Sequence, residues 1–216
     1  MRPDASPAEV RQWITHHLDP LDTSIIGGMA VGGDLNLNPA QAAEAPRAWI
    51  PAAVLVGLVQ REHGLSVLLT RRSDSLRSHT GQVAFPGGRC DPGETPWETA
   101  LREAQEEIGL DPSLVELAGL STPYRTAVTG FQIMPVVGFV SPDITLTPNP
   151  DEVADIFETP FGFLMDPKNL EQQERETPTG VRRRFYAATW EGQYIWGATA
   201  GMLRSLYDRL YGASLA

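Results

Sequence analysis

The chain has 216 residues and a formal net charge of −10, with 27 acidic and 17 basic side chains. This length suits one domain with a sizeable core, and the acidic balance argues against binding to nucleic acid, which relies on Lys and Arg. No apolar run is long enough to span a bilayer, the N-terminus lacks the apolar core of a secretion signal, and the single Cys90 cannot form an internal disulfide. We therefore expect a cytoplasmic protein without a membrane or nucleic-acid partner.

The first 47 residues are expected to form a helix and a linker arm. A capping box at Ser6 and Glu9 predicts a helix that runs to about Leu18. From residue 19 to residue 47 the chain is rich in Gly, Ala, Asn and Pro, which is typical of a linker or a loosely packed arm. Such an arm could order against a second subunit, so a homodimer is a candidate assembly.

Residues 48–216 are expected to form the folded domain. The run Ala52–Gln60 is continuously apolar, as in a buried strand, and a turn at Glu62–Gly64 returns the chain into a second strand, Leu65–Thr70. The other predicted strands are Val83–Phe85, Val115–Tyr124, Phe131–Val140, Glu152–Phe157, Phe185–Thr189 and Tyr194–Trp196, and Glu171–Arg184 is expected to be a hairpin or a flexible loop.

Three helices accompany these strands. A short one is predicted at Phe161–Met165, and Thr199–Tyr211 has apolar residues on one side, as in an amphipathic helix packed on a sheet. The third helix follows a glycine-rich turn: Thr95 can cap it, with Glu98 completing a capping box, and Gly109 can end it in the left-handed conformation. Together these elements predict an α/β fold with a mixed sheet.

Three glutamates on the third helix, Glu103, Glu106 and Glu107, fall at i, i+3 and i+4 and therefore share a face. Each like-charged pair costs roughly 0.2–0.5 kcal/mol in an isolated helix. On this pattern alone, a solvated acidic face is the more common explanation. A hard divalent cation would turn the repulsion into coordination, because carboxylate oxygens suit Mg²⁺ or Mn²⁺. The preceding turn also brings the carbonyl of Gly88 within reach as a further ligand.

The same stretch resembles the Nudix box, G-x5-E-x7-R-E-U-x-E-E-x-G-U, in which U is apolar. Its fixed positions are filled by Gly88, Glu94, Arg102, Glu103, Glu106, Glu107 and Gly109. The resemblance implies an α/β/α Nudix sandwich and a hydrolase of phosphoanhydride bonds that depends on Mg²⁺ or Mn²⁺. It also implies that the three glutamates and the Gly88 carbonyl hold the metal, while Arg102 orients the glutamates through an ion pair with Glu94.

A second signature lies upstream, between Leu68 and Gly88. It resembles that of the coenzyme A diphosphatase branch, L-L-T-x-R-S-x3-R-x3-G-x3-F-P-G-G, and every fixed position matches. This resemblance implies hydrolysis of the diphosphate linkage of coenzyme A or acyl-CoA into 3′,5′-ADP and (acyl-)4′-phosphopantetheine. Arg72 and Arg77 hold fixed positions, and their planar guanidinium groups suit phosphate. His79 is a candidate to bind phosphate, and a structural hydrogen bond inside its loop is an equal alternative.

Some roles and functions stay open at this point. For the general base, one alternative is that a metal-bound hydroxide needs little help, and another is that Glu106 or Glu107 accepts the proton. Glu152 is a candidate for a further ligand or the base, and a surface carboxylate is an equal interpretation of it. An alternative function is a Nudix hydrolase that acts on another nucleoside diphosphate derivative, such as ADP-ribose or NADH. A non-catalytic Nudix-like module that binds a nucleotide or a protein is less favoured, because such a module need not keep the three glutamates and Arg102.

Overall fold

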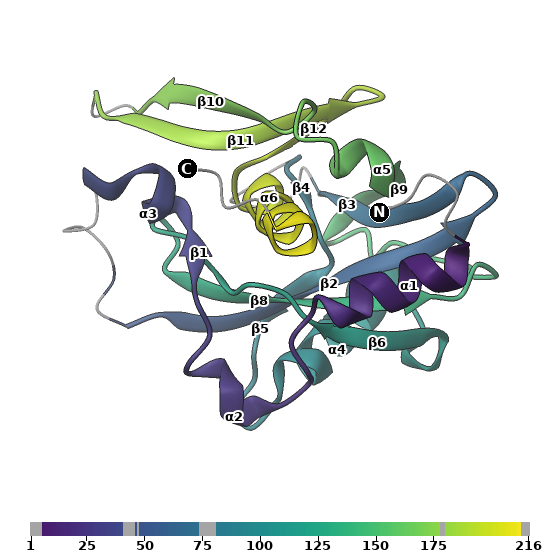
Figure 1. The fold of residues 1–216 in the computed structure, drawn as a ribbon. Helices are drawn as coiled ribbons and strands as arrows, with labels where there is room; N and C mark the ends of the chain where they lie inside the picture. Colours follow the sequence, from purple (N-terminus) through teal and green to yellow (C-terminus); the bar gives the residue numbers. More distant parts are fainter. Residues whose placement is uncertain (1–5, 41–45, 47, 74–80, 178–179, 213–216) are drawn as a thin grey trace.

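The computed structural model describes residues 6–40, 46, 48–73, 81–177 and 180–212. As predicted, the fold is α/β, with helices packed on both sides of a mixed sheet (Figure 1). The helices are α1 (Pro7–His16), α2 (Thr23–Ile26), α3 (Asp34–Leu37), α4 (Pro96–Ile108), the 3₁₀ turn η2 (Pro112–Leu114), α5 (Phe161–Leu164) and α6 (Gly197–Tyr211). No helix in the described part of the chain combines the length and the apolar character needed to cross a membrane.

The strands form two sheets. The larger sheet contains β1 (Gly32–Gly33), β2 (Ile50–Arg61), β3 (Gly64–Arg72), β4 (Val83–Ala84), β5 (Gly87–Arg89), β6 (Val115–Leu120), β7 (Tyr124–Arg125), β8 (Phe131–Val140) and β9 (Val153–Pro160). Its main path runs β1-β7-β8-β2-β3-β4, while β5, β6 and β9 pair with β2, β8 and β3. The smaller sheet is the antiparallel set β10 (Glu171–Glu176), β11 (Arg182–Trp190) and β12 (Gln193–Trp196).

The predicted hairpin of β2 and β3 is confirmed, since Leu58 pairs with Val67 and Arg61 with Gly64 in antiparallel register. On its other side, β2 pairs in parallel with β8 from Ile50 to Val59. Strand β2 is therefore enclosed by neighbours on both edges, which explains why its sequence is apolar without alternation. The interpretation of 171–184 as a hairpin is also confirmed, because β10 pairs with the first part of β11.

The structure contains short strands that were not predicted as such. Strand β5, read as a glycine turn, pairs antiparallel with β2 and so docks the turn onto the sheet. Gly87 allows this pairing, because a Cβ there would lie 2.4 Å from the carbonyl oxygen of Ala53. The predicted strand over 115–124 is divided into β6 and β7, which pair with different parts of β8.

The arm between residues 19 and 47 is more ordered than its composition predicts. It contains α2, β1 and α3, and β1 pairs in parallel with β7. The Asp34 carboxylate accepts hydrogen bonds from the Tyr124 hydroxyl at 2.9 Å and from the Ala127 amide at 3.0 Å. The division of the chain after residue 47 stays a prediction, although the arm contributes a strand to the larger sheet.

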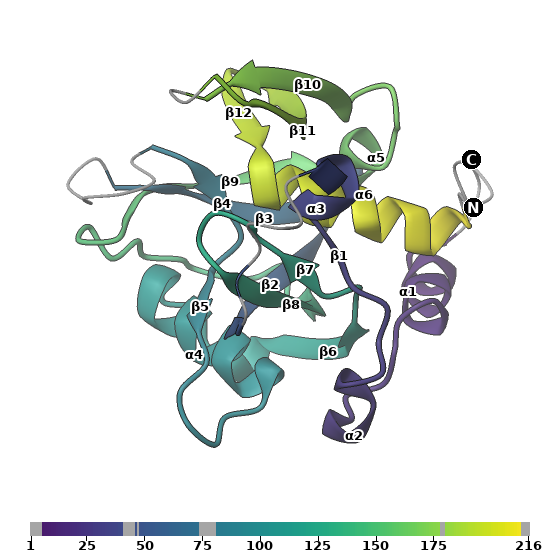
Figure 2. The ribbon, with the colours of Figure 1, turned by 90° about the vertical axis from the view of Figure 1, so that its left-hand side faces the viewer.

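The core consists of two apolar clusters, one on each face of the larger sheet. Helix α6 packs on one face through Leu203 and Leu206, and α4 covers the other through Ala104 and Ile108. Figure 2 shows α6 and α4 on opposite sides of the strands. Burying one large aliphatic side chain contributes about 1.5–3 kcal/mol, so this packing fixes α4 firmly beside β5.

Candidate active site

Helix α4 has the caps that its sequence predicts. Thr95 Oγ1 accepts a hydrogen bond from the Glu98 amide at 3.3 Å, and Glu98 Oε2 accepts one from the Thr95 amide at 2.8 Å. At the other end, Gly109 adopts the left-handed conformation with φ of 66°. Since both ends and the apolar face are fixed, the directions of the helix's glutamates are fixed too.

The glycine turn and the helix meet at Gly88 and Glu103. A Cβ on Gly88 would lie 2.5 Å from Glu103 Oε1, which is far inside van der Waals contact. Strand β5 can therefore lie against the carboxylate only because position 88 has no side chain. Burial raises the pKa of Glu103, and hydrogen bonding to Arg102 offsets part of that rise.

Arg102 connects the carboxylates of this site to one another. Its Nε donates to Glu94 Oε1 at 2.7 Å, and its Nη2 donates to Glu94 Oε2 at 3.1 Å. Its Nη1 donates to Glu103 Oε1 at 2.9 Å and to Glu106 Oε2 at 3.0 Å. Nη2 also reaches the Arg89 carbonyl at 3.2 Å, which ties the helix to β5. The hydrogen bonds from Arg102 hold the pKa of Glu94 at about 2.

Glu107 lies under the glycine turn and is only 3% exposed. Its Oε2 accepts a hydrogen bond from the Gly87 amide at 3.1 Å, and Arg72 Nη1 lies 3.9 Å from its Oε1. Burial raises the pKa of Glu107 to about 7, although the Gly87 amide and Arg72 both act in the opposite direction. Burial therefore outweighs the two groups that favour the charged form of Glu107.

The other two candidate carboxylates, Glu106 and Glu152, belong to different elements of the fold. The Glu106 side chain is 56% exposed and faces solvent beside Arg102. Glu152 directly precedes β9, and its Oε1 accepts a hydrogen bond from Asn149 Nδ2 at 3.4 Å. Its negative charge raises the pKa of both Glu103 and Glu107, so the fold brings it to the site. Its role as general base or further ligand stays a prediction.

Arg72, at the end of β3, lies beside Glu107. Its Nε is buried and has no hydrogen-bond partner among the described residues. A buried N–H without an acceptor costs roughly 1–3 kcal/mol, which favours a site that a ligand completes. The two other predicted phosphate contacts, Arg77 and His79, lie outside the described residues.

The predicted metal-binding glutamates lie near one another, but each of them already accepts a hydrogen bond from another group of the protein. In the described part of the chain, no three His, Cys, Asp or Glu side chains are gathered closely enough to hold a metal ion. Arg102 bonds Glu103 and Glu106, and the Gly87 amide bonds Glu107. The donor set still fits a hard divalent cation, because Glu103, Glu106 and Glu107 supply carboxylate oxygens from one helix beside the glycine turn. The three glutamates and the Gly88 carbonyl as ligands stay predictions.

One feature of the site was missed from the sequence, namely that Glu107 is buried while Glu106 is not. The sequence does contain a signal for this difference. Glu107 follows Ala100 by seven positions and Ala104 by three, so helical spacing places it at the border of the apolar stripe. The helical pattern does not show that the Gly87 amide donates a hydrogen bond to Glu107, which lowers the cost of burying this carboxylate.

Comparison with known proteins agrees with this geometry. A family model described as "NUDIX domain" matches residues 49–188. "Uncharacterized Nudix hydrolase NudL" of Yersinia enterocolitica is 44% identical over 160 residues, covering 74% of this chain and 80% of the relative. The protein of the same name from Pectobacterium atrosepticum is 41% identical over 161 residues, covering 72% and 80%.

A solved structure shows the same fold. The Nudix hydrolase RenU from M. smegmatis superposes with a TM-score of 0.51 and 18% identity, covering 78% of this chain and 90% of the other. At that identity the likeness concerns the fold alone, whereas the family model and the two relatives share sequence as well. On these grounds the chain belongs to the Nudix hydrolase family.

Proposed function

We propose that this protein hydrolyses the diphosphate linkage of coenzyme A or acyl-CoA, giving 3′,5′-ADP and (acyl-)4′-phosphopantetheine. Membership of the family supports the reaction type and the need for a metal, since Nudix hydrolases act on nucleoside diphosphate derivatives and use divalent metal ions. The choice of coenzyme A comes from the signature between Leu68 and Gly88. A cytoplasmic location, with Mg²⁺ or Mn²⁺ as the ion, belongs to the same proposal.

The observation that carries the proposal is the position of Arg72. Arg72 occupies a fixed position of the coenzyme A signature, and its Nη1 lies 3.9 Å from Oε1 of Glu107, a residue of the Nudix box. The two signatures therefore meet at one place. Arg72 also has a buried Nε without a partner among the described residues. A substrate phosphate oxygen would supply the missing acceptor, and the planar guanidinium can bind phosphate through two hydrogen bonds.

Each side chain at the site has a role that follows from its contacts. Arg72 would bind the diphosphate beside the acidic helix, and Arg102 would hold Glu94, Glu103 and Glu106 in position. A divalent cation, when bound, would compensate the charge of the diphosphate and of the carboxylates. Hydrolysis then requires water to attack phosphorus in line with the leaving oxygen, so positioning supplies most of the rate.

The proton released by the attacking water needs an acceptor. Glu152 is one candidate, because it faces the helix from a separate loop and its amide neighbour Asn149 is bonded to the backbone of Glu107. Glu106 and Glu107 are the others. A series of single Glu→Gln variants separates these possibilities, since loss of the base alone should change the pH profile of kcat as well as its size.

A substrate panel tests the proposal. The purified protein is incubated with Mg²⁺ or Mn²⁺ and with coenzyme A, acetyl-CoA, ADP-ribose or NADH, and the products are separated by chromatography. We expect 3′,5′-ADP from the first two, with the highest kcat/KM for one of them. A clear preference for ADP-ribose or NADH would overturn the coenzyme A assignment and leave the family assignment intact.

A second variant tests whether the protein is catalytic at all. Replacing Glu106 and Glu107 together by Gln should abolish turnover while the circular dichroism spectrum stays native, because both carboxylates are lost with little change in shape. A double variant at Glu171 and Glu176, which are exposed on β10, is the matched control and should retain activity. If the first variant kept full activity, the metal site would be refuted.

A further inference from the structure

A cavity of about 350 Å³ lies between the arm and helix α6. Glycines of β1 and residues of α3 form one wall, and α6 contributes Arg204 and Asp208 to the other. Tyr124 of β7 and Tyr186 of β11 complete it. Strand β1 lies beside α6 (Figure 1). This volume falls within the range of small-molecule binding sites.

The cavity is separate from the candidate active site. It lies on the α6 side of the larger sheet, whereas the glutamates of α4 lie on the opposite side (Figure 2). None of its lining residues belongs to the Nudix box or to the upstream signature. A function for the cavity must therefore come from its own chemistry.

Arg204 is the unusual side chain of this cavity. It is only 8% exposed, yet a guanidinium group carries five N–H donors. One of these is used, because Nε donates to Asp208 Oδ1 at 3.0 Å. Within the described part of the chain, Nη1 and Nη2 make no hydrogen bond. Four N–H donors of Arg204 thus have no protein acceptor among the residues described, and they are not among the fully buried unpartnered atoms, so the contents of the cavity can reach them.

The aromatic neighbours of Arg204 do not remove this need. The guanidinium carbon lies 5.3 Å from the ring centre of Tyr186 and 5.4 Å from that of Tyr207, which are cation–π distances. Such contacts stabilise the charge through the ring faces, but a ring face is a much weaker acceptor than an oxygen. The Nη groups therefore remain without a protein acceptor among the described residues.

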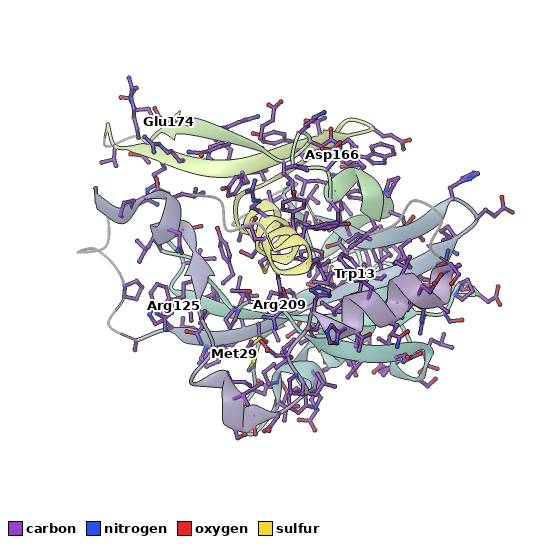
Figure 3. The ribbon with its side chains drawn as sticks, in the orientation of Figure 1. Trp13, Met29, Arg125, Asp166, Glu174 and Arg209 are labelled. Carbon is purple, nitrogen blue, oxygen red and sulfur yellow. The ribbon has the colours of Figure 1, made fainter. Side chains whose placement is uncertain are left out.

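We propose that this cavity binds a small organic anion, whose carboxylate or phosphate group accepts hydrogen bonds from Arg204 Nη1 and Nη2. Both groups present paired oxygens that match the planar fork of a guanidinium. The cavity is larger than the anionic group alone requires, and the rings of Tyr124 and Tyr186 offer contacts for a carbon body. Arg209, labelled in Figure 3, adds positive charge at the rim, although its Nη2 is already 2.8 Å from Asp19 Oδ2.

Isothermal titration calorimetry, in a buffer that contains a metal chelator, tests the proposal with three probes: inorganic phosphate, ribose 5-phosphate and glutarate. We expect at least one probe to bind the wild-type protein, and binding to weaken at least about tenfold in Arg204→Gln, which keeps most of the side chain's volume and loses the charged donors. The comparison of the three probes shows whether phosphate or carboxylate, with or without a carbon body, is preferred.

Asp208→Asn is the matched variant, because it breaks the same ion pair and leaves the Arg204 donors in place. It should bind the same probe at least as tightly as the wild type, since a competing negative charge is removed. Equal affinity of Arg204→Gln and wild type would overturn the proposal, and so would equal weakening by both variants.

A crystallographic measurement covers the case in which Arg204→Gln does not fold. Wild-type crystals are soaked in the three probes, and the density next to Arg204 is inspected. An anionic group within hydrogen-bond distance of Nη1 or Nη2 supports the site. Water alone at those atoms, in crystals soaked at concentrations far above the dissociation constants expected of a specific site, refutes it.

Discussion

Gly88 shows how one missing side chain positions the chemistry of the whole site. Because it has no Cβ, strand β5 lies directly against the Glu103 carboxylate, and the neighbouring amide of Gly87 reaches Glu107. The glycine run of the sequence correctly indicated a close backbone approach. It could not indicate which carboxylates are approached, because that depends on how β5 pairs with β2.

Replacing Gly88 by Ala should therefore displace Glu103. The added Cβ would lie 2.5 Å from Glu103 Oε1, so the carboxylate or the strand must move. We expect kcat/KM to fall by about 100-fold, as a misplacement of about 1 Å can do, and steady-state kinetics measures it. Gly27→Ala is the control, because a Cβ at that position meets nothing within 4 Å; equal activity of the two variants would contradict the account.

Arg102 makes a second prediction at this scale. Its planar group contacts Glu94, Glu103 and Glu106 together, and a lysine cannot span these partners from one nitrogen. Arg102→Lys should lower kcat by roughly 10- to 100-fold, the range for groups that orient metal ligands.

Arg61→Lys is the matched comparison, since Arg61 also forms a fork with one glutamate, Glu158. That pair belongs to β2 and β9 and does not contact the glutamates of α4. The kcat of Arg61→Lys should stay at the wild-type value. Its free energy of unfolding should change little, because partly exposed ion pairs contribute about 0–1 kcal/mol. A similar loss of activity in both variants would show that Arg102 acts only through stability.

Among the elements, α1 and α4 were predicted well because their signals are local. Capping boxes at Ser6 and Thr95, and the glycine after α4, depend on residues a few positions apart. Strands β1 and β5 were missed because each has two or three residues and becomes a strand only through a distant partner. Composition correctly indicated glycine-rich chain there, but not its pairing.

The two capping boxes allow a comparison between elements. Thr95→Ala and Ser6→Ala each remove a side-chain acceptor for the third amide of a helix, so each should lower the free energy of unfolding by about 1 kcal/mol. Urea unfolding measures both. Because Glu94 and the start of α4 adjoin Arg102, we expect only Thr95→Ala to reduce kcat/KM as well, and a loss in Ser6→Ala would contradict this.

At the scale of the whole molecule, Asp34 joins the arm to the domain. Burial raises the pKa of Asp34 above its ordinary value of 3.8, even though Tyr124 and Ala127 donate hydrogen bonds to it. Between that value and the raised one, the folded protein binds more protons than the unfolded chain. The contribution of Asp34 to stability therefore falls as pH rises through this window.

Asp34→Asn should remove that contribution to the pH dependence. The free energy of unfolding, measured by urea titration at several pH values from 3.8 upward, should fall less steeply with pH in the variant than in the wild type. The variant also loses one of the two acceptors, so its absolute stability should be lower by about 1 kcal/mol. Parallel curves for the two proteins would show that Asp34 does not titrate in this way.

The parallel pairing of β2 with β8, and of β1 with β7, has a consequence for how the protein is made. On the ribosome, the apolar β2 emerges about 80 residues before its partner β8, and α6, which covers one face of the sheet, emerges after all the strands. The nascent chain therefore carries uncovered apolar segments until α6 has emerged. A ribosomal stall or a truncation before α6 would leave an aggregation-prone intermediate that depends on chaperones, instead of a smaller active enzyme.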